Sequence, residues 1–344
     1  MASDHQAPVN KLVSRLADDE LKARIYPLTE VADQALRDNL SSHVSYIEKV
    51  SSYIIFSGGK RLRPVLFLLA ASAVGGQGDP RLAAIFEYLH AATLLHDDVV
   101  DEAGLRRGRP AARVEYGNDS VILVGDFLFS KSYSLAVEVP DIRFVSALSD
   151  CTTIMAEGQV LELIHTDDQE LSLEGYLEVI KAKTAVLIAA ACQMGAICAG
   201  AEDAEVQALH DYGLNLGLAF QMVDDALDYV GTAHEFGKPV GHDLAEGKIT
   251  LPFIHVRDTA PAPVRQRLLE LAPMGREGDQ GAQAIQEAKE LISAHGGVEA
   301  TYAQAMRYAA LAQTALARLG SKTSPGSDLE TLLALAAYVL ERRH

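Results

Sequence analysis

The sequence predicts an all-α protein built as one large helical bundle, and three observations support this fold class. Nearly every segment shows the periodicity of helices, the chain is rich in Ala, Leu and Glu, and alternating Val/Ile/Thr runs bounded by turn signals are hard to find. With 344 residues, of which 49% are hydrophobic and 22% charged, the chain is expected to be globular and not disordered.

Breaks that contain glycine or proline divide the chain into ten or more expected helices. No linker is long enough to mark a domain boundary, so residues 1–344 are expected to form a single domain. Residues 274–281 are expected to form a surface loop. The breaks lie at residues 57–59, 75–80, 104–110, 139–141, 200–203, 231–247 and 260–263.

Two of the expected helices carry the same acidic motif. The first helix starts near Pro80 and ends in the motif, and the second contains it internally. In each motif the first and last Asp are four residues apart and the second and last are three apart, so a helix places the carboxylates side by side on one face. One such motif alone is equally well explained as a solvated acidic turn. Two motifs framed by apolar residues instead favour Mg²⁺, which prefers hard oxygen ligands and neutralises the repelling charges. The six residues are Asp97, Asp98 and Asp101, and Asp224, Asp225 and Asp228.

Between these helices, residues 185–200 form an apolar stretch that is interrupted by Gln193. The stretch is shorter than the ~20 residues that a membrane span requires, so a buried helix and no transmembrane segment are expected. The N-terminus shows no basic segment followed by an apolar one, so no secretory signal is expected. Three cysteines without metal-site spacing are expected to be buried reduced thiols, which favours a cytoplasmic location: Cys151, Cys192 and Cys198.

Positive charge gathers near the acidic motifs, although 30 Lys+Arg against 47 Asp+Glu give the chain a net charge of −17. This balance argues against nucleic acid as a partner, because phosphate-backbone binding needs a basic surface. Taken singly, each basic residue is more simply a surface charge. Together with two Mg²⁺-type motifs they predict a site for two diphosphates, because Arg and Lys bind phosphate oxygens. These residues are Lys60, Arg63, Arg106, Arg107, Arg109, Lys181, Lys183, Lys238 and Lys248.

The motifs, in this order along the chain, resemble those of the trans-isoprenyl diphosphate synthases. The resemblance rests on GGKRLRP from Gly58, DDVVD with LRRGRP from Asp97, Lys183-Thr184, and FQMVDDALD with GKPVGHDLAEGK from Phe220. It covers roughly Lys11 to Arg343 and is greatest to the long-chain, octaprenyl-type synthases that make quinone side chains. The resemblance implies helices around a deep central cavity, a homodimer, Mg²⁺ as cofactor, and isopentenyl diphosphate and an allylic prenyl diphosphate as substrates.

The resemblance also implies roles for individual residues. The six aspartates would bind Mg²⁺, with Asp224 as the principal ligand of the second motif. Lys183, Thr184 and Gln221 would take part in catalysis with the aspartates. Isopentenyl diphosphate would be bound by Lys60, Arg63, His90 and Arg107, and the allylic diphosphate by Arg106, Lys183, Thr184, Gln221, Lys238 and Lys248. His90 lies seven residues before Asp97 and so shares its helical face, whereas His96 is rotated ~100° away and is left out. Without the resemblance, His90 would be read as a core histidine.

Product length is expected to depend on the helix that precedes Asp97. Four residues form a small-to-apolar stripe that adjoins the aspartate face, ~40° to ~140° around the helix. Near the metal the stripe carries only small side chains, where short-chain members of the family tend to place an aromatic residue. A long all-trans product of about eight to ten isoprene units is therefore expected, because the helix back to Arg81 spans ~24 Å. Core packing is the alternative explanation of the stripe, which consists of Ala92, Thr93, Leu89 and Ile85.

Other functions are consistent with parts of this pattern. A short-chain synthase making farnesyl or geranylgeranyl diphosphate differs only in the stripe. A terpene cyclase would also carry one acidic motif, but the second motif and the GGKRLRP segment argue against it. A non-catalytic subunit is expected to lack some of the metal carboxylates, and this chain has all six.

Overall fold

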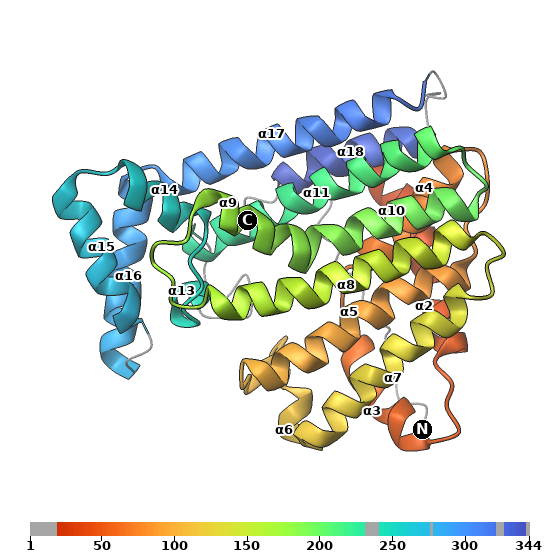
Figure 1. The fold of residues 1–344 in the computed structure, drawn as a ribbon, viewed down its shortest axis with the longest axis horizontal. Coiled ribbons are helices and arrows are strands. Elements are labelled where there is room, and N and C mark those ends of the chain that lie inside the picture. Colours follow the sequence, from red (N-terminus) through yellow and green to blue (C-terminus); the bar gives the residue numbers. More distant parts are fainter. Residues whose placement is uncertain (1–18, 231–240, 276–277, 321–326, 342–344) are drawn as a thin grey trace. The chain divides into compact units, whose positions relative to one another are not determined.

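The computed structural model describes residues 19–230, 241–275, 278–320 and 327–341, and apart from one short hairpin its regular elements are helical (Figure 1). The all-α prediction is confirmed. The helices are α2 (Asp19–Asn39), α3 (Ser45–Ile55), α4 (Leu62–Ala73), α5 (Pro80–Val100), α6 (Ala112–Tyr116), α7 (Asn118–Ala136), α8 (Ile142–Ile164), α9 (Leu173–Ile180), a π-helical turn (Lys181–Ala185), α10 (Val186–Cys198), α11 (Asp203–Val230), α13 (His242–Ala245), α14 (Leu251–Thr259), α15 (Ala262–Met274), α16 (Gly278–Ala294), α17 (Gly297–Ala317) and α18 (Asp328–Glu341).

The described residues group into two compact units. The first unit contains those of Met1–Ser149, Ala190–Leu209 and Leu319–Ala334, and the second contains those of Asp150–Ala189, His210–Arg318 and Leu335–His344. Each unit is described below by itself. The single domain over residues 1–344 stays a prediction.

In the first unit, α5 is the central helix and packs most extensively on α7. It begins as a helix start should, because the Asp79 side chain accepts a hydrogen bond from the Arg81 N–H and Pro80 occupies the first turn. The contact with α7 is close because Gly125 has no side chain: a Cβ there would lie 2.2 Å from Nε2 of His96. His96 is stacked on Phe129 of α7, with ring centroids 6.1 Å apart. This histidine is therefore turned toward α7.

A hairpin follows α5, in a segment that the sequence marks only as a break. Its strands β1 (Leu105–Arg106) and β2 (Arg109–Pro110) are antiparallel, and Arg106 is paired with Arg109. The two loop residues both have positive φ, 54° at Arg107 and 75° at Gly108. This is the backbone of a type I′ turn, which joins two strands with the correct twist. Strands of two residues carry no detectable alternation, so the sequence could not predict them.

In the second unit, three helical segments approach one another at backbone distance. A Cβ added at Gly217 of α11 would lie 2.5 Å from Cα of Ala185, and one added at Gly158 of α8 would lie 2.5 Å from Cβ of Ala182. Both alanines belong to the π-helical turn. A larger residue at either glycine would force the segments apart. The glycines therefore fix where the side chains of the π-helical turn point.

The apolar stretch is longer in the structure than the sequence predicts. α9, the π-helical turn and α10 form one helical run over Leu173–Cys198, 26 residues, which is long enough to cross a membrane. The expectation that the stretch is too short is therefore wrong, because the helix starts earlier, after Ser172. However, 78% of its most apolar window is buried inside the protein. The prediction of a buried core helix is confirmed.

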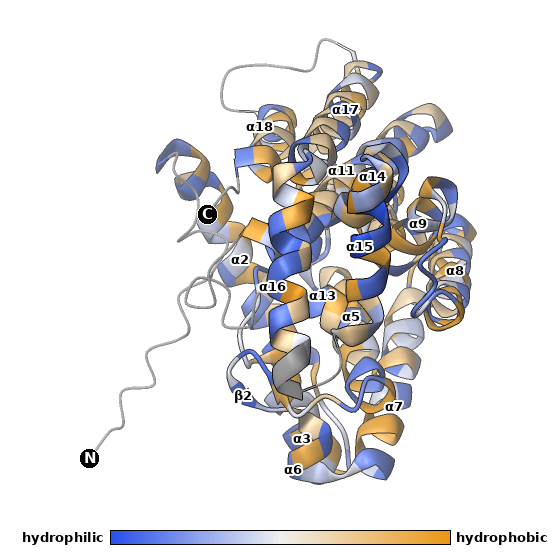
Figure 2. Ribbon diagram, turned by 90° about the vertical axis from the view of Figure 1, so that its left-hand side faces the viewer, coloured by the Kyte–Doolittle hydropathy of each residue, from blue (hydrophilic) through white to orange (hydrophobic). Residues whose placement is uncertain are grey.

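At the surface of the second unit, α15 and α16 pack against each other. Arg267 of α15 donates to Glu287 of α16, with Nε 2.6 Å from Oε1. Hydrophobic and hydrophilic residues alternate along α16 (Figure 2). This pattern is typical of a helix with one face against the protein and one in water.

Candidate active site

The first acidic motif closes α5. Asp97 and Asp98 lie in its last turn, and the N–H of Asp101 donates to the carbonyl of Asp97 at 2.8 Å. The Asp98 side chain is fully buried and accepts a hydrogen bond from Nε of Arg106 at 2.5 Å. Asp97 is 8% exposed and Asp101 is exposed. The hairpin arginine thus holds the middle carboxylate, while Asp97 and Asp101 are one helical turn apart on a common face.

Next to this motif, a buried arginine organises the GGKRLRP segment. Arg61 precedes α4 in a left-handed conformation, with φ of 50°, and its side chain is 5% exposed. It donates to Asp33 of α2 at 2.6 Å and to Glu87 of α5 at 3.0 Å. A Cβ added at Gly59 would lie 3.0 Å from Nη1 of Arg61 and 3.8 Å from Nη1 of Arg107. A side chain at this position would thus crowd the Arg61 guanidinium group. Arg61 is visible in the GGKRLRP motif, but the sequence does not indicate these pairings.

Three of the residues predicted to bind isopentenyl diphosphate come together in this first unit, namely Arg63, His90 and Arg107. Burial lowers the pKa of His90 well below 6.5, and the charges of Arg63, Arg107 and Arg106 lower it further. Burial also lowers the pKa of Arg107. Lys60 is half-buried in the same segment as Arg61. His90 is therefore neutral near pH 7 and stands among arginines, an environment that attracts an anion.

In the second unit, the predicted catalytic residues form a hydrogen-bonded chain. Thr184 Oγ1 in the π-helical turn donates to Gln221 Oε1 at 2.8 Å, and Gln221 Nε2 donates to Asp225 Oδ1 at 2.7 Å. The buried hydroxyl of Tyr176 donates to Asp225 Oδ2 at 2.6 Å. Tyr176, which no motif in the sequence marked, thus completes the hydrogen-bonded chain. π-helical turns occur often at functional sites, and this one directs Thr184 to α11.

Asp228, the last residue of the second motif, meets the short helix α13. The carboxylate of Asp228 accepts the backbone N–H groups of His242 at 3.2 Å and Asp243 at 3.0 Å. Burial raises the pKa of Asp243, and the charges of Asp228 and Asp225 raise it further. Asp243 lies in the GHDLAEGK segment that carried the resemblance, although no role was predicted for it. Asp224 is half-buried on α11, one turn before Asp228.

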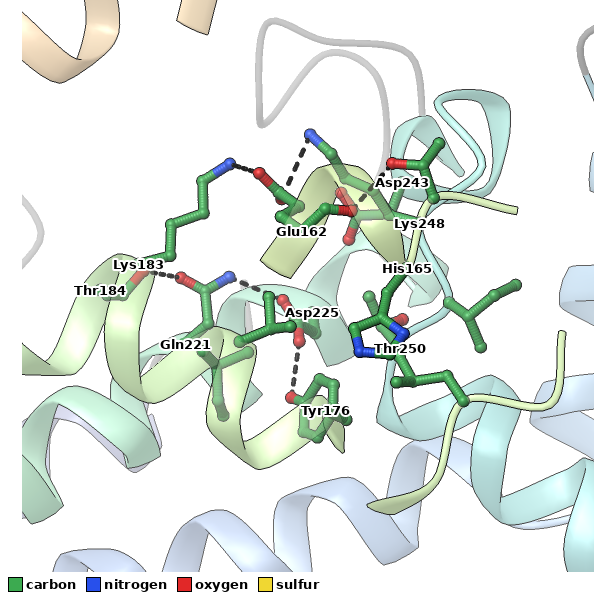
Figure 3. A pocket seen from close by; sticks show the side chains of 15 residues that line it. Glu162, His165, Tyr176, Lys183, Thr184, Gln221, Asp225, Asp243, Lys248 and Thr250 are labelled. Carbon is green, nitrogen blue, oxygen red and sulfur yellow. Dashed lines mark hydrogen bonds and ion pairs between the residues drawn. The ribbon is translucent and has the colours of Figure 1, made fainter. Parts of the chain in front are cut away.

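These side chains surround a cavity of about 160 Å³ in the second unit (Figure 3). It brings together five residues that the sequence predicts, namely Lys183, Thr184, Gln221, Asp225 and Lys248. Lys238 lies outside the described residues, and Arg106, the remaining residue predicted to bind the allylic diphosphate, lies in the hairpin of the first unit, where it pairs with Asp98. The other lining residues are Glu162, His165, Thr166, Leu171, Tyr176, Val179, Ile180, Asp243, Ile249 and Thr250.

The aspartates suit Mg²⁺ in their chemistry. Within the described ranges, no three His, Cys, Asp or Glu side chains converge as a complete metal site. Mg²⁺ does not need one, because it binds through one or two carboxylates and completes its shell with water and substrate phosphates. Each motif offers carboxylate oxygens one helical turn apart, so the donor set is consistent with Mg²⁺. The assignment of the six aspartates as ligands stays a prediction.

The buried carboxylate of Asp225 leads to a prediction about pH. Burial raises the pKa of Asp225 from 3.8 to about 7, which the hydrogen bonds from Tyr176 and Gln221 oppose and the charges of Asp224 and Asp228 assist. Because this pKa is raised in the folded state, the contribution of the Asp225 carboxyl to the free energy of unfolding is complete below pH 3.8. It is lost as the pH rises through about 7. Without Mg²⁺, Asp225→Asn is expected to melt at a higher temperature than the wild type at pH 8, and this advantage should shrink toward pH 4. Calorimetric melting of both proteins across this range checks it. A difference in melting temperature that does not change with pH would contradict this prediction.

The proposed chain-length residues lie on α5 in the first unit. Ile85, Leu89 and Ala92 have no exposed surface. Thr93 is half-buried, and its hydroxyl donates to the carbonyl of His90 at 2.9 Å. Full burial is consistent with both a tunnel wall and ordinary core packing. Their role in chain length stays a prediction.

The sequence and the fold are similar to those of known proteins. The polyprenyl synthetase family matches residues 44–292. An octaprenyl diphosphate synthase of Haemophilus influenzae is 38% identical over 326 residues, which cover 93% of this chain and 95% of that protein. A geranylgeranyl diphosphate synthase of Saccharolobus solfataricus is 30% identical over 95% of this chain and 100% of its own length. The crystal structure of a polyprenyl synthase from Caulobacter crescentus, complexed with calcium and isoprenyl diphosphate, has a TM-score of 0.84 and 40% identity, and the match covers 95% of this chain and 98% of that one.

Proposed function

The chain belongs to the polyprenyl synthetase family and is a trans-prenyl diphosphate synthase, and from this premise we propose that it adds isopentenyl diphosphate repeatedly to farnesyl diphosphate to make a long-chain product. The observation that carries the proposal is the cavity where Lys183, Thr184, Gln221 and Lys248 converge beside Asp225. Two ammonium groups there provide the charge that an allylic diphosphate needs. The product would serve as a quinone side chain.

The arrangement supports a division of labour between the two basic groups. Lys183 and Lys248 would hold the allylic diphosphate, and Lys60, Arg63, His90 and Arg107 would hold isopentenyl diphosphate. The family uses a divalent metal with diphosphate, and we propose that it is Mg²⁺ here, held by the aspartates. When bound, the metal supplies positive charge that stabilises the departing diphosphate. The oxygen atoms of Thr184 and Gln221 would help to stabilise the allylic cation, and the released diphosphate would accept the final proton.

The assembly and location are also part of the proposal. A homodimer is proposed from the family resemblance, and α7 of the first unit exposes apolar side chains, with Ile122 41% and Leu123 66% exposed. An exposed apolar patch of this kind is typical of a protein interface. A cytoplasmic location agrees with the burial of Cys151 and Cys192.

Incubation of the purified protein with farnesyl diphosphate, isopentenyl diphosphate and Mg²⁺ tests the function. Chromatography of the dephosphorylated products is expected to show a chain of about eight to ten isoprene units, because the helix before Asp97 is long enough for it. A product that stops at three or four units would support the short-chain alternative, which has relatives such as the geranylgeranyl diphosphate synthase. A cyclic hydrocarbon would overturn the proposal in favour of a terpene cyclase.

Mutations in the two diphosphate sites are expected to change the KM values of different substrates. Arg107→Ala should mainly raise the KM for isopentenyl diphosphate, and Lys183→Ala mainly that for the allylic substrate, because a charge-assisted phosphate contact contributes roughly 1.5–3 kcal/mol. Lys60→Ala should behave like Arg107→Ala, and Lys238→Ala like Lys183→Ala. Steady-state kinetics with each substrate varied in turn checks this. Arg265→Ala, which removes an exposed charge of α15 that has no predicted role in binding, is the control. The same KM profile in all the variants would contradict the division.

A further inference from the structure

We propose that Glu162 is a positioning residue that pairs with Lys183 and Lys248 before the allylic diphosphate binds. The diphosphate displaces Glu162 from these lysines when it binds, and Glu162 pairs with them again when the diphosphate leaves. This inference rests on the proposed function, and it concerns a residue that no motif of the sequence marked. Three observations carry it: the ion pairs of Glu162, its fixed placement, and the charge that it sets in the cavity.

Glu162 lies in the last turn of α8 between the two lysines (Figure 3). One carboxylate oxygen contacts Nζ of Lys183, and the other lies 3.7 Å from Nζ of Lys248. The Glu162 side chain is 14% exposed, and those of Lys183 and Lys248 are 28% and 21% exposed. All three line the same cavity. A single carboxylate therefore connects two lysines from different segments of the second unit.

The backbone holds Glu162 in this place. Gly158, one turn earlier on α8, touches Ala182, which directly precedes Lys183. Beyond the end of α8, the N–H of Asp167 donates to the carbonyl of Gly247 at 2.8 Å, and Gly247 directly precedes Lys248. The segments that carry the two lysines are thus each attached to α8 next to Glu162. These two backbone contacts hold Glu162 beside both lysines, which distinguishes its ion pairs from a chance contact between surface side chains.

The charges explain why the pairing is an exchange. A carboxylate carries one negative charge, whereas a diphosphate carries more and offers more acceptor oxygens to the same ammonium groups. The diphosphate therefore displaces Glu162 when it binds. When the spent diphosphate leaves, Glu162 again compensates the lysines, which lowers the cost of release. Lys248 also contacts Glu246, with Nζ 2.6 Å from Oε2, so the effect should be larger at Lys183.

The test compares Glu162→Gln with the wild type, using inorganic diphosphate as the probe. Calorimetry should show about fivefold tighter binding of diphosphate to the variant. Two unit charges about 4 Å apart in water interact with about 1 kcal/mol, which corresponds to about a fivefold change in the dissociation constant. The binding event compared is the one that Lys183→Ala weakens. The KM for the allylic substrate should fall by a similar factor, kcat should fall because release slows, and the KM for isopentenyl diphosphate should stay unchanged.

Two further variants complete the design. Glu162→Asp keeps the charge and should restore diphosphate binding toward the wild-type value. Glu157→Gln removes an exposed carboxylate from the same helix and should change nothing, which controls for net charge. If Glu162→Gln does not fold, Glu162→Asp against Glu162→Ser gives the same comparison of charge.

Weaker or unchanged diphosphate binding by the folded Glu162→Gln variant would overturn the exchange. Weaker binding in both Glu162→Gln and Glu162→Asp would instead show a purely structural role. Failure of the proposed function has a separate signature, since the wild type would then form no prenyl product while its diphosphate binding could still be measured.

Discussion

Replacement of Asp97 or Asp224 by Asn is expected to lower kcat by about three orders of magnitude, because the metal-mediated stabilisation of the departing diphosphate amounts to several kcal/mol. Asp97 is 8% exposed at the end of α5, and Asp224 is half-buried on α11. The fold should survive, since each change removes one of several like charges. Steady-state kinetics with a circular-dichroism melt of each variant checks both parts.

The control for this experiment is Asp150→Asn, which removes an exposed carboxylate from α8 and should leave kcat unchanged. Activity should also vanish when the metal is removed, because the carboxylates then repel the anionic substrates. Full activity in excess EDTA would contradict the assignment of Mg²⁺ to these aspartates.

Ala92→Phe or Ala92→Tyr is expected to shorten the product without abolishing condensation. Ala92 is fully buried on α5, in the turn that precedes the acidic motif. If it lines the path of the growing chain, an added ring blocks that path and leaves the reacting groups in place. The product should then fall from about eight to ten isoprene units to a few, as chromatography of the dephosphorylated products will show.

The melting temperature of Ala92→Phe distinguishes a tunnel wall from core packing. A ring that enters a tunnel should leave Tm nearly unchanged, whereas a ring forced into a packed core costs about 1–3 kcal/mol. Ala91→Phe is the matched control, because Ala91 is 3% exposed on the same helix but points in another direction. It is expected to lower Tm without shortening the product. An unchanged product distribution in Ala92→Phe would show that the tunnel is misplaced.

The helical fold and the aspartate motifs could be predicted because their signals are local, whereas Thr184 and Gln221 were predicted only through the family resemblance. Helical periodicity and the four-residue spacing of the aspartates are both visible within a few turns of chain. The cavity brings Lys183, Thr184, Gln221, Asp225 and Lys248 together in agreement with the resemblance. Their chemical roles are still to be tested by mutation.

The residues that the sequence did not predict act over long separations. Glu162 and Tyr176 are single polar residues on helices, and nothing nearby distinguishes them from surface positions. Tyr176 meets Asp225 across 49 residues of sequence. Arg61 was visible in its motif, but its pairing with Asp33 and Glu87 depends on the packing of three helices. The π-helical turn could not be predicted either, because the helix that follows it, Val186–Cys198, is apolar on nearly all sides and a shift of its face by one residue is not visible in the sequence.

The type I′ turn of the hairpin bears on efforts to engineer this enzyme. Turns of this type strongly prefer Asn-Gly, and here Arg107 takes the left-handed position that Asn would occupy more easily. A redesign guided by turn statistics would therefore replace Arg107 and gain thermal tolerance at that position. It would also remove a guanidinium from the cluster around His90. Thermostabilisation of this protein should accordingly leave the hairpin loop untouched, since its backbone strain accompanies a useful charge.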